Sequence, residues 1–295
     1  MSENRESWDV KDKTCVISGA TSGIGHATAR GLLDAGAHVT MVVRSKDKAE
    51  AACTELATAS GNPNIDFVIC DFSSFASMRA AATELLARLP RIDILINNAG
   101  IVNLERELTH DGIEAVYGVN HLGYFLFTDL LLPRLRESAP ARIVNVASHA
   151  HKFAKIEIDD LEGTQSWSSL AAYGRSKGCN ILFTRELARR LEGSGITVNA
   201  LHPGGVSTGL GANNQGWFAR IIHPVAMLFM KSPEKGARTS IFLATSDAVS
   251  GVSGGYFANC REASSTPQTQ DMALAQRLWE ISEGQCGLAS AAGAG

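Results

Sequence analysis

The sequence predicts a single-domain α/β fold built on a doubly wound sheet of seven parallel strands. Short β-branched runs alternate with longer amphipathic stretches, which is typical of parallel strands joined by crossover helices. A glycine-rich turn follows the first run, and no shift in composition marks a second domain before about residue 260. With 295 residues, 45% of them hydrophobic and 19% charged, the chain has the composition of an ordinary globular protein and can bury a full core.

Seven short, mostly aliphatic runs are predicted strands, because strands buried on both faces of a parallel sheet are apolar throughout. In chain order they are 14–18 (TCVIS), 38–43 (HVTMVV), 66–70 (DFVIC), 92–97 (IDILIN), 141–147 (ARIVNVA), 196–201 (ITVNAL) and 255–257 (GYF). The stretches between them carry apolar residues at helical spacing. They predict helices over 26–35, 46–59, 75–89, 112–135, 170–191 and 233–244.

Charge, cysteine spacing and hydropathy exclude several classes of protein. Lys and Arg number 27 against 30 Asp and Glu, a formal net charge of -3, and basic residues do not cluster, so no nucleic-acid partner is expected. The six cysteines lack CxxC and Cys/His spacing, which argues against a metal site and against a disulfide scaffold. The N-terminus lacks a signal-peptide pattern, and no apolar stretch reaches the ~20 residues of a membrane helix. We expect a reduced, cytoplasmic protein with no integral membrane segment.

A phosphate-binding turn is predicted where the first strand ends. The segment SGATSGIG leads directly into a helix, and its GxxxGxG spacing lets the backbone approach a pyrophosphate, which the helix N-terminus then binds through free N–H groups and its dipole. Glycine-rich turns also occur as plain structure, but the position between a strand and a helix predicts a Rossmann-type nucleotide site. The expected contacts are Gly19, Thr21, Ser22, Gly23, Ile24 and Gly25.

The residue after the second strand, Arg44, predicts which nucleotide binds. An acid at this place would accept from the ribose 2′-hydroxyl of NAD, whereas an arginine offers a planar fork of donors to a 2′-phosphate. NADP(H) is therefore the expected cofactor, and NAD(H) use remains compatible. The alternative is that Arg44 is a solvated surface arginine.

Residues after the third and fourth strands are further candidates for nucleotide binding. Asp71 is placed to accept from the adenine amino group, although capping the helix that begins near Phe75 is an alternative. Asn98, Ala99 and Gly100 let the chain pass close beneath a cofactor, while the amide can tie neighbouring strands together. A wholly structural role explains this segment equally.

Tyr173 and Lys177 form a YxxxK pair, which places both side chains on one face of a helix. A neighbouring ammonium favours the phenolate and lowers the tyrosine pKa, so such a tyrosine can shuttle a proton. The pattern is common by chance in helices. It gains weight from Ser148, after the fifth strand, and Asn120, in the preceding helix, each placed where it could face the same crevice.

Together these pieces resemble a classical short-chain dehydrogenase/reductase (SDR), most closely the retinol dehydrogenase-like branch. The resemblance runs from about Lys13 to Phe257. Besides Arg44 it rests on SGATSGIG, CDFSS, NNAG, VNHLGYFLFT, RIVNVASHAH, YGRSK and VNALHPGGVST, in the family's order and spacing. The polar N-terminus departs from it by lacking the membrane anchor of many retinol dehydrogenases, which weakens the expectation of a retinoid substrate.

The resemblance implies a catalytic tetrad of Asn120, Ser148, Tyr173 and Lys177. In ketone reduction Tyr173 would donate the proton and Ser148 would hydrogen-bond the substrate oxygen. Lys177 would hold the nicotinamide ribose and lower the tyrosine pKa, and Asn120 would order a water linking Lys177 to solvent. Positioned donors of this kind stabilise the charge that develops on oxygen as hydride reaches carbon. The same resemblance completes the cofactor-binding set with Phe72, Pro203, Gly204, Val206 and Thr208.

The apolar segment 209–232 leaves the sixth strand where a ligand would sit, so it is predicted to be a substrate lid; a packing helix or a subunit contact is the alternative. We assign 1–12 to an N-terminal extension, 13–260 to an NAD(P)-binding SDR domain that includes the lid, and 261–295 to a C-terminal helix and flexible tail. The aromatic face of 112–135, with Tyr124, Phe125 and Phe127, fits either a homodimer interface or core packing.

Three histidines flank the predicted site, and we expect them to line it or to cap local backbone without transferring protons. They are His149, His151 and His202. A tyrosine is already placed as the proton donor.

The sequence as a whole predicts an NADP(H)-dependent oxidoreductase, a carbonyl reductase or alcohol dehydrogenase for an alcohol, ketone or aldehyde of medium to large apolar character. Reduction is the expected direction because NADPH, the reduced form of the expected cofactor, donates a hydride. One alternative is an epimerase or dehydratase of the same fold that returns the hydride. The other is a non-catalytic NADP-sensing scaffold, against which the complete tetrad argues.

Overall fold

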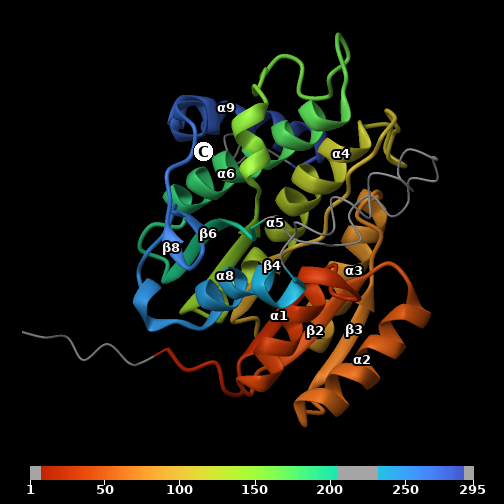
Figure 1. Ribbon diagram of the computed structural model, residues 1–295, viewed down its shortest axis with the longest axis vertical. Helices are drawn as coiled ribbons and strands as arrows, with labels where there is room; N and C mark the ends of the chain where they lie inside the picture. Colours follow the sequence, from red (N-terminus) through yellow and green to blue (C-terminus); the bar gives the residue numbers. More distant parts are fainter. Residues whose placement is uncertain (1–7, 205–231, 289–295) are drawn as a thin grey trace, which may run out of the picture.

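The strands form one twisted sheet at the centre of the molecule (Figure 1). The computed structural model describes residues 8–204 and 232–288, and within them the sheet has eight strands in the order β3-β2-β1-β4-β5-β6-β7-β8. All neighbouring pairs are parallel except β7 and β8, which are antiparallel. The strands are β1 Thr14–Ser18, β2 His38–Val43, β3 Ile65–Ile69, β4 Ile94–Asn97, β5 Ala141–Val146, β6 Ile196–His202, β7 Tyr256–Ala258 and β8 Arg261–Glu262.

Helices follow the strands as crossover connections. They are α1 Gly23–Asp34, α2 Lys46–Ser60, α3 Phe75–Arg88, α4 Ala115–Tyr117, α5 Gly123–Glu137, α6 Ser169–Arg190, α8 Pro233–Thr245 and α9 Met272–Gln285. A π turn, η1, covers Gly118–Leu122, and the 3₁₀ turns are η2 His149–Phe153, η3 Asp247–Val249 and η4 Pro267–Gln270.

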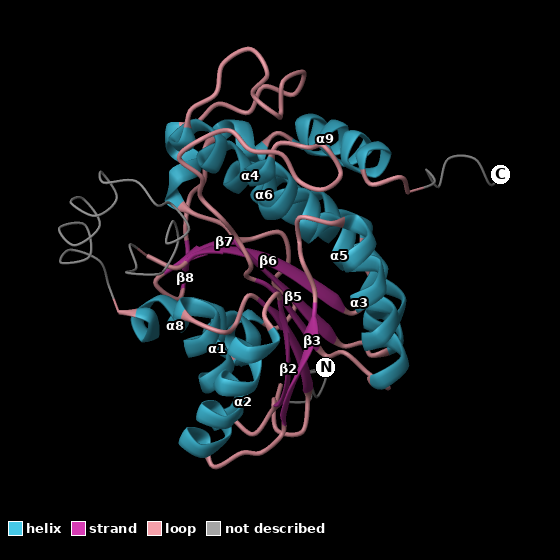
Figure 2. Ribbon diagram, turned by 90° about the vertical axis from the view of Figure 1, so that its right-hand side faces the viewer, coloured by secondary structure: helices cyan, strands magenta, loops and turns pink. Residues whose placement is uncertain are grey.

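The helices cover both faces of the sheet (Figure 2). On one face α1, α2 and α8 lie side by side, and on the other α3, α5 and α6 do, with α9 packed against α6. Each face has its own hydrophobic cluster, so the central strands are apolar on both sides. The ring of Trp279 on α9 lies 4.8 Å from that of Phe125 and 5.9 Å from that of Phe183, so the C-terminal helix completes this core.

The sheet order places the nucleotide-binding turn at its switch point. The chain runs from β1 outward to β2 and β3, returns to pair β4 with β1, and continues outward on the other side. Connections therefore diverge between the carboxyl ends of β1 and β4, which opens the crevice where ligands of such sheets bind.

The predicted parallel sheet is confirmed, and the structure adds an eighth strand at its edge. The eighth strand has only two residues, which pair antiparallel as Glu262 with Phe257 and Arg261 with Ala258. So short a strand gives no periodic signal in the sequence. Strand bounds agree within two residues, and α1 begins at Gly23, inside the glycine turn, rather than at residue 26.

The helix predicted over 112–135 is confirmed as one continuous helical stretch, but it begins at Ala115 and contains a π turn. It consists of α4, the π turn η1 and then α5, which ends at Glu137. A π turn inserts one extra residue into one turn of a helix. This changes the spacing of apolar residues too little to be detected in a stretch of about two dozen residues. Tyr124, Phe125 and Phe127 are at most 1% exposed within this one chain, so core packing accounts for the aromatic face.

None of the helices among the described residues is long and apolar enough to span a membrane.

Candidate functional site

The turn after β1 is built from glycines that no other residue could replace without strain. Gly19 has φ +69°, and a Cβ there would lie 2.8 Å from the Ala99 Cα atom. A Cβ on Gly25 would lie 2.2 Å from the carbonyl oxygen of Gly19. The side chain of Ser22 caps none of the N–H groups of α1. The turn therefore leaves the helix N-terminus open toward the switch point, where it can bind an anion.

Asn98 holds this turn against the end of β4. Its amide donates to the carbonyl oxygens of Ser18 and Gly19, at 2.8 and 2.9 Å. The Ser18 hydroxyl in turn accepts from the backbone N–H groups of Asn98 and Ala99, at 2.9 and 3.0 Å. Asn98 thus has the structural role that sequence reasoning left open. The part played by Ser18 was missed, although the residue lies inside the glycine motif.

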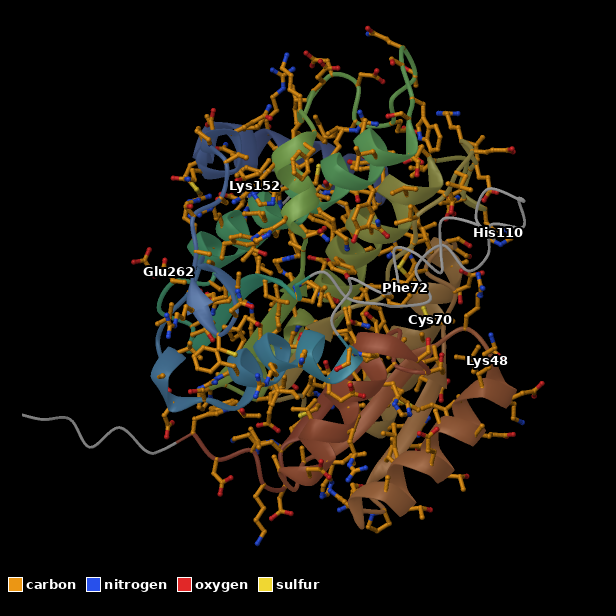
Figure 3. The ribbon with its side chains drawn as sticks, in the orientation of Figure 1. Lys48, Cys70, Phe72, His110, Lys152 and Glu262 are labelled. Atoms are coloured by element: carbon orange, nitrogen blue, oxygen red, sulfur yellow. The ribbon has the colours of Figure 1, made fainter. Side chains whose placement is uncertain are left out.

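The ends of β2 and β3 supply the next part of the site. Arg44 is exposed one residue beyond β2, and within the described part of the chain its guanidinium makes no ion pair. Figure 3 labels Cys70 and Phe72 where the chain leaves β3, on either side of Asp71. The carboxylate of Asp71 accepts from the backbone N–H and the hydroxyl of Ser73, at 2.9 and 2.8 Å. Ser74, not Asp71, caps α3, so the capping explanation of Asp71 is wrong.

A cleft of about 480 Å³ joins these pieces to the proposed catalytic residues. It runs along the carboxyl ends of β1, β2, β3, β4 and β5. The candidates that line it are Gly19, Thr21, Ser22, Gly23, Ile24, Gly25, Arg44, Asp71, Phe72, Asn98, Ala99, Gly100, Tyr173, Lys177 and Pro203. Gly204 follows Pro203 directly. Val206, Thr208 and the predicted lid, apart from Ser232, lie outside the described residues.

Tyr173 lines one end of this cleft and is hydrogen-bonded to Ser148, which is not among the lining residues. Ser148 accepts from the backbone N–H of Ala150 at 3.1 Å, which leaves its hydroxyl hydrogen available for another acceptor. Burial raises the pKa of Tyr173, and a hydrogen bond with Ser148 partly opposes the rise. At neutral pH the phenol therefore carries its proton.

Lys177 lies one helical turn beyond Tyr173 and is only 3% exposed. Its Nζ donates to the carbonyl oxygen of Val146 at 3.0 Å and lies 5.7 Å from the centroid of the Tyr173 ring. Burial lowers the pKa of Lys177 to about 7. Gly100 is close as well, since a Cβ there would lie 3.5 Å from this nitrogen.

Asn120 lies in the π turn, fully buried, and its amide is already occupied by protein partners. Its Oδ1 accepts from the N–H of Ile101 at 2.8 Å, and its Nδ2 donates to the carbonyl oxygen of Ile101 at 3.0 Å and to the hydroxyl of Ser176 at 3.1 Å. The Ser176 hydroxyl donates to the Tyr173 carbonyl oxygen at 2.8 Å. The side chain thus braces the loop after Gly100 against α6. Ser176 was missed, although it precedes Lys177 in YGRSK.

The three histidines near Ser148 are engaged in local contacts. The rings of His149 and His202 stack with centroids 3.7 Å apart, and His202 Nδ1 accepts from the His149 backbone N–H at 3.2 Å. His151 Nδ1 lies 2.6 Å from the Ser148 carbonyl oxygen, and its pKa is lowered by burial. These contacts agree with residues that shape the site rather than transfer protons.

The described geometry fits a bound dinucleotide. The three glycines of the turn line the cleft, the open N-terminus of α1 suits a pyrophosphate, and Arg44 is unpaired among the described residues. The lining residues follow the strand ends from the glycine turn to Tyr173. A nucleotide extended along them would place its reactive end beside Tyr173.

Comparisons with known proteins agree with this geometry. The family model "short chain dehydrogenase" matches residues 13–217. The chain is 46% identical to retinol dehydrogenase 14 of Homo sapiens over 293 residues, covering 94% of this chain and 87% of that protein.

Solved structures extend the likeness to the fold. A crystal structure of an uncharacterized protein from Mycobacterium paratuberculosis is 32% identical, covers 96% of each chain and has a TM-score of 0.76. The RhlG/NADP active-site complex of Pseudomonas aeruginosa is 29% identical with a TM-score of 0.67, covering 84% of this chain and 95% of that one. The match over most of the chain, together with the cleft that joins the glycine turn to Tyr173 and Lys177, makes this protein a member of the short-chain dehydrogenase/reductase family, in its retinol dehydrogenase-like branch.

Proposed function

We propose that the protein is an NADP(H)-dependent carbonyl reductase or alcohol dehydrogenase whose substrate is an alcohol, ketone or aldehyde of medium to large apolar character. One observation carries the proposal: a single cleft begins at the glycine turn and Arg44 and ends at Tyr173 and Lys177. The family is one of oxidoreductases that bind NAD(P)(H).

The preference for NADP(H) follows from the charge at the end of β2. Arg44 is exposed and lines the cleft, and no acid stands at this strand end to accept from a ribose 2′-hydroxyl. A guanidinium pairs with a phosphate through two parallel hydrogen bonds. The relative solved with NADP in its active site is consistent with this choice.

The residues at the other end of the cleft handle a proton. When bound, the reduced nicotinamide supplies a hydride to a carbonyl carbon. Tyr173, whose raised pKa keeps it protonated, then gives its proton to the oxygen, and the Ser148 hydroxyl hydrogen-bonds the same oxygen. The proton transfer leaves Tyr173 as a tyrosinate, and the positive charge of Lys177 stabilises this anion.

Asn120 is also proposed to order a water beside Lys177. Because the side-chain amide of Asn120 is already hydrogen-bonded to Ile101 and Ser176, a backbone group of the π turn would hold this water. Asn120 then acts by fixing that turn in place.

The substrate class is proposed from the relatives and the rim of the cleft. Several curated relatives are named retinol dehydrogenases, so retinol and retinal are the first substrates to try. Leu108, on the rim, is 56% exposed and Leu104 in the same loop 51%, which offers apolar contacts to a ligand at the mouth.

The test follows the absorbance of NADPH and NADH with retinal and a panel of apolar ketones, aldehydes and quinones. We expect turnover with NADPH that exceeds turnover with NADH, and loss of about a hundredfold or more in Tyr173→Phe while NADPH still binds. Near-normal rates in Tyr173→Phe would reject the tyrosine assignment. Retained nucleotide with conversion of substrate but no net absorbance change would instead show an epimerase or dehydratase.

A further inference from the structure

Tyr124 lies against the ammonium group of Lys177. It is the second residue of α5 and is fully buried, and its ring centroid is 5.2 Å from Lys177 Nζ. This is closer than the ring of Tyr173, at 5.7 Å from the same nitrogen. Among the described residues, the ammonium also donates a hydrogen bond to the Val146 carbonyl oxygen, at 3.0 Å. Two aromatic rings and one carbonyl thus lie beside a buried cation on the wall of the cleft.

A buried ammonium in this setting needs compensation. Burial is the one resolved cause of the lowered Lys177 pKa, and it acts against the charged form. An ammonium has three donors, and a single carbonyl satisfies one of them. The face of an aromatic ring carries negative charge density and attracts a cation, more strongly where water is excluded.

Among the described residues, no carboxylate supplies this compensation. The tyrosines and histidines of α5, α6, the π turn and η2 are neutral at pH 7, and the further ionisable residue of η2, Lys152, is basic and so cannot compensate a cation. Burial raises the pKa of Tyr124 and Tyr173 and lowers those of His121 in the π turn and of His149 and His151 in η2. The aromatic rings are therefore the groups left to favour the cation.

In the part of the chain that the structure describes, the hydroxyl of Tyr124 makes no contact that would account for a tyrosine at this position. It is buried, and within the described residues it has no hydrogen-bond partner. The ring, by contrast, belongs to the hydrophobic cluster under α5 and α6 and is fixed there by packing. Its position depends on the preceding π turn, whose Asn120 is bonded to Ile101 and Ser176.

We propose that Tyr124 is a positioning residue for Lys177: the face of its ring holds and stabilises the charged ε-ammonium beside Tyr173. The catalytic use of Lys177 rests on the proposed function, but the contact itself does not. The ring acts through Lys177 and needs no contact with substrate. Its hydroxyl is dispensable.

The test titrates Lys177 directly in protein free of nucleotide. Lysine labelled with ¹³C at Cε is followed by NMR against pH, and the Lys177 signal is assigned from its absence in Lys177→Arg. The variants are Tyr124→Leu, which removes the ring, and Tyr124→Phe, which keeps it. Phe125→Leu is the matched control, because Phe125 is 1% exposed on the same helix and packs on Phe183 and Trp279 instead.

Loss of the ring removes a stabilisation of the charged form, so Lys177 should lose its proton at lower pH. We expect the midpoint to fall by about one pH unit in Tyr124→Leu and to stay within about 0.3 units in Tyr124→Phe and Phe125→Leu. If Tyr124→Leu does not fold, Tyr124→Met fills more of the space and carries the same expectation. An unchanged midpoint in the ring-deleted variant would overturn the proposal, as would an equal shift in Phe125→Leu.

The pH profile of kcat/KM with NADPH separates this proposal from the proposed function. The alkaline limb should move to lower pH in Tyr124→Leu alone, whereas simple damage to the core would lower the rate equally at every pH. A shifted NMR midpoint in a protein that reduces no carbonyl would uphold the contact and reject the proposed function. A shifted alkaline limb without a shifted midpoint would reject the role of Tyr124.

Discussion

Lys177 and Arg44 line the same cleft, but their surroundings differ. Lys177 is buried, so its charge depends on a carbonyl and on aromatic rings. Arg44 is exposed and unpaired among the described residues, so its charge is available to a ligand. Cofactor choice is therefore tested at Arg44, where a substitution disturbs no packing.

Arg44→Ala should raise the KM for NADPH by about ten- to a hundredfold, because a charge-assisted hydrogen bond is worth about 1.5–3 kcal/mol. The KM for NADH should change less than about threefold, since NADH has no 2′-phosphate. Initial rates at varied nucleotide concentration measure both constants.

Lys46→Ala is the matched control for this change. Lys46 is another exposed cation, two residues further on, and its Nζ lies 3.7 Å from Glu50. It should leave both constants within about twofold, as expected for a surface ion pair. Equal increases for NADPH and NADH in Arg44→Ala would show that Arg44 does not contact a 2′-phosphate.

At the scale of elements, the approach of η2 to α6 brings Ser148 to Tyr173. Gly174, the residue after Tyr173, allows that approach, because a Cβ there would lie 2.6 Å from the Ala150 carbonyl oxygen and 2.7 Å from the Ala154 Cβ. Both obstacles are fixed by the backbone. A side chain at 174 must therefore push the 3₁₀ turn away from the helix.

Gly174→Ala should lower kcat by about tenfold or more, because a misplacement of about 1 Å is costly to oriented groups. The free energy of unfolding should change by less than about 2 kcal/mol, since alanine favours the helix while the contact with η2 is strained. Turnover and urea unfolding measure the two effects separately.

Gly284→Ala is the control helix substitution. Gly284 lies in α9 with open space around its Cα, so alanine there should stabilise the fold by about 0.5–1 kcal/mol and leave kcat unchanged. Unchanged kcat in Gly174→Ala would mean that the spacing of η2 and α6 does not set the Ser148–Tyr173 contact.

At the scale of the whole molecule, His121 joins the π turn to the C-terminal helix. Its Nε2 lies 3.0 Å from the hydroxyl of Ser282 on α9, and that hydroxyl donates to the Leu278 carbonyl oxygen. His121 must therefore donate, which places its proton on Nε2. Its Nδ1 is buried without a partner among the described residues, and burial lowers the pKa of His121 to about 3.

Because His121 is buried in its neutral form, we expect the free energy of unfolding to fall in acid. Its folded pKa lies below the unfolded value of 6.5, so the unfolded chain binds the extra proton between about pH 6.5 and 3. The free energy of unfolding should fall across that window by about 1.4 kcal/mol per pH unit on account of this group. Its contribution is complete above pH 6.5.

Urea unfolding at pH 7, 6, 5 and 4 tests this, with His121→Leu as the variant. His121→Leu is less stable at pH 7, having lost the bond to Ser282, but its stability should decline less steeply toward acid. Parallel slopes for the two proteins would contradict a neutral buried histidine. His38→Leu is the control, since it removes an exposed histidine at the start of β2 instead of a buried one.

The fold and much of the cleft were predictable because they depend on local patterns. The apolar runs of β1 and β2 have the same bounds in prediction and structure, since strands buried on both faces give an unbroken signal. The glycine turn was predictable because positive φ at Gly19 and close approach at Gly25 require that residue type. Residues whose role comes from distant partners, such as Ser18 and Ser176, carried no such signal.

The sequence by itself determined the alternation of strands and helices, the position of the phosphate-binding turn and the one-turn spacing of Tyr173 and Lys177, because each depends on neighbours along the chain. Only the tertiary structure decided that the helix over 112–135 is interrupted by a π turn, that Asn120 is occupied by Ile101 and Ser176, and that Tyr124 packs on Lys177. These features come from contacts between segments tens of residues apart, and burial in those contacts is what shifts the pKa of the lysine.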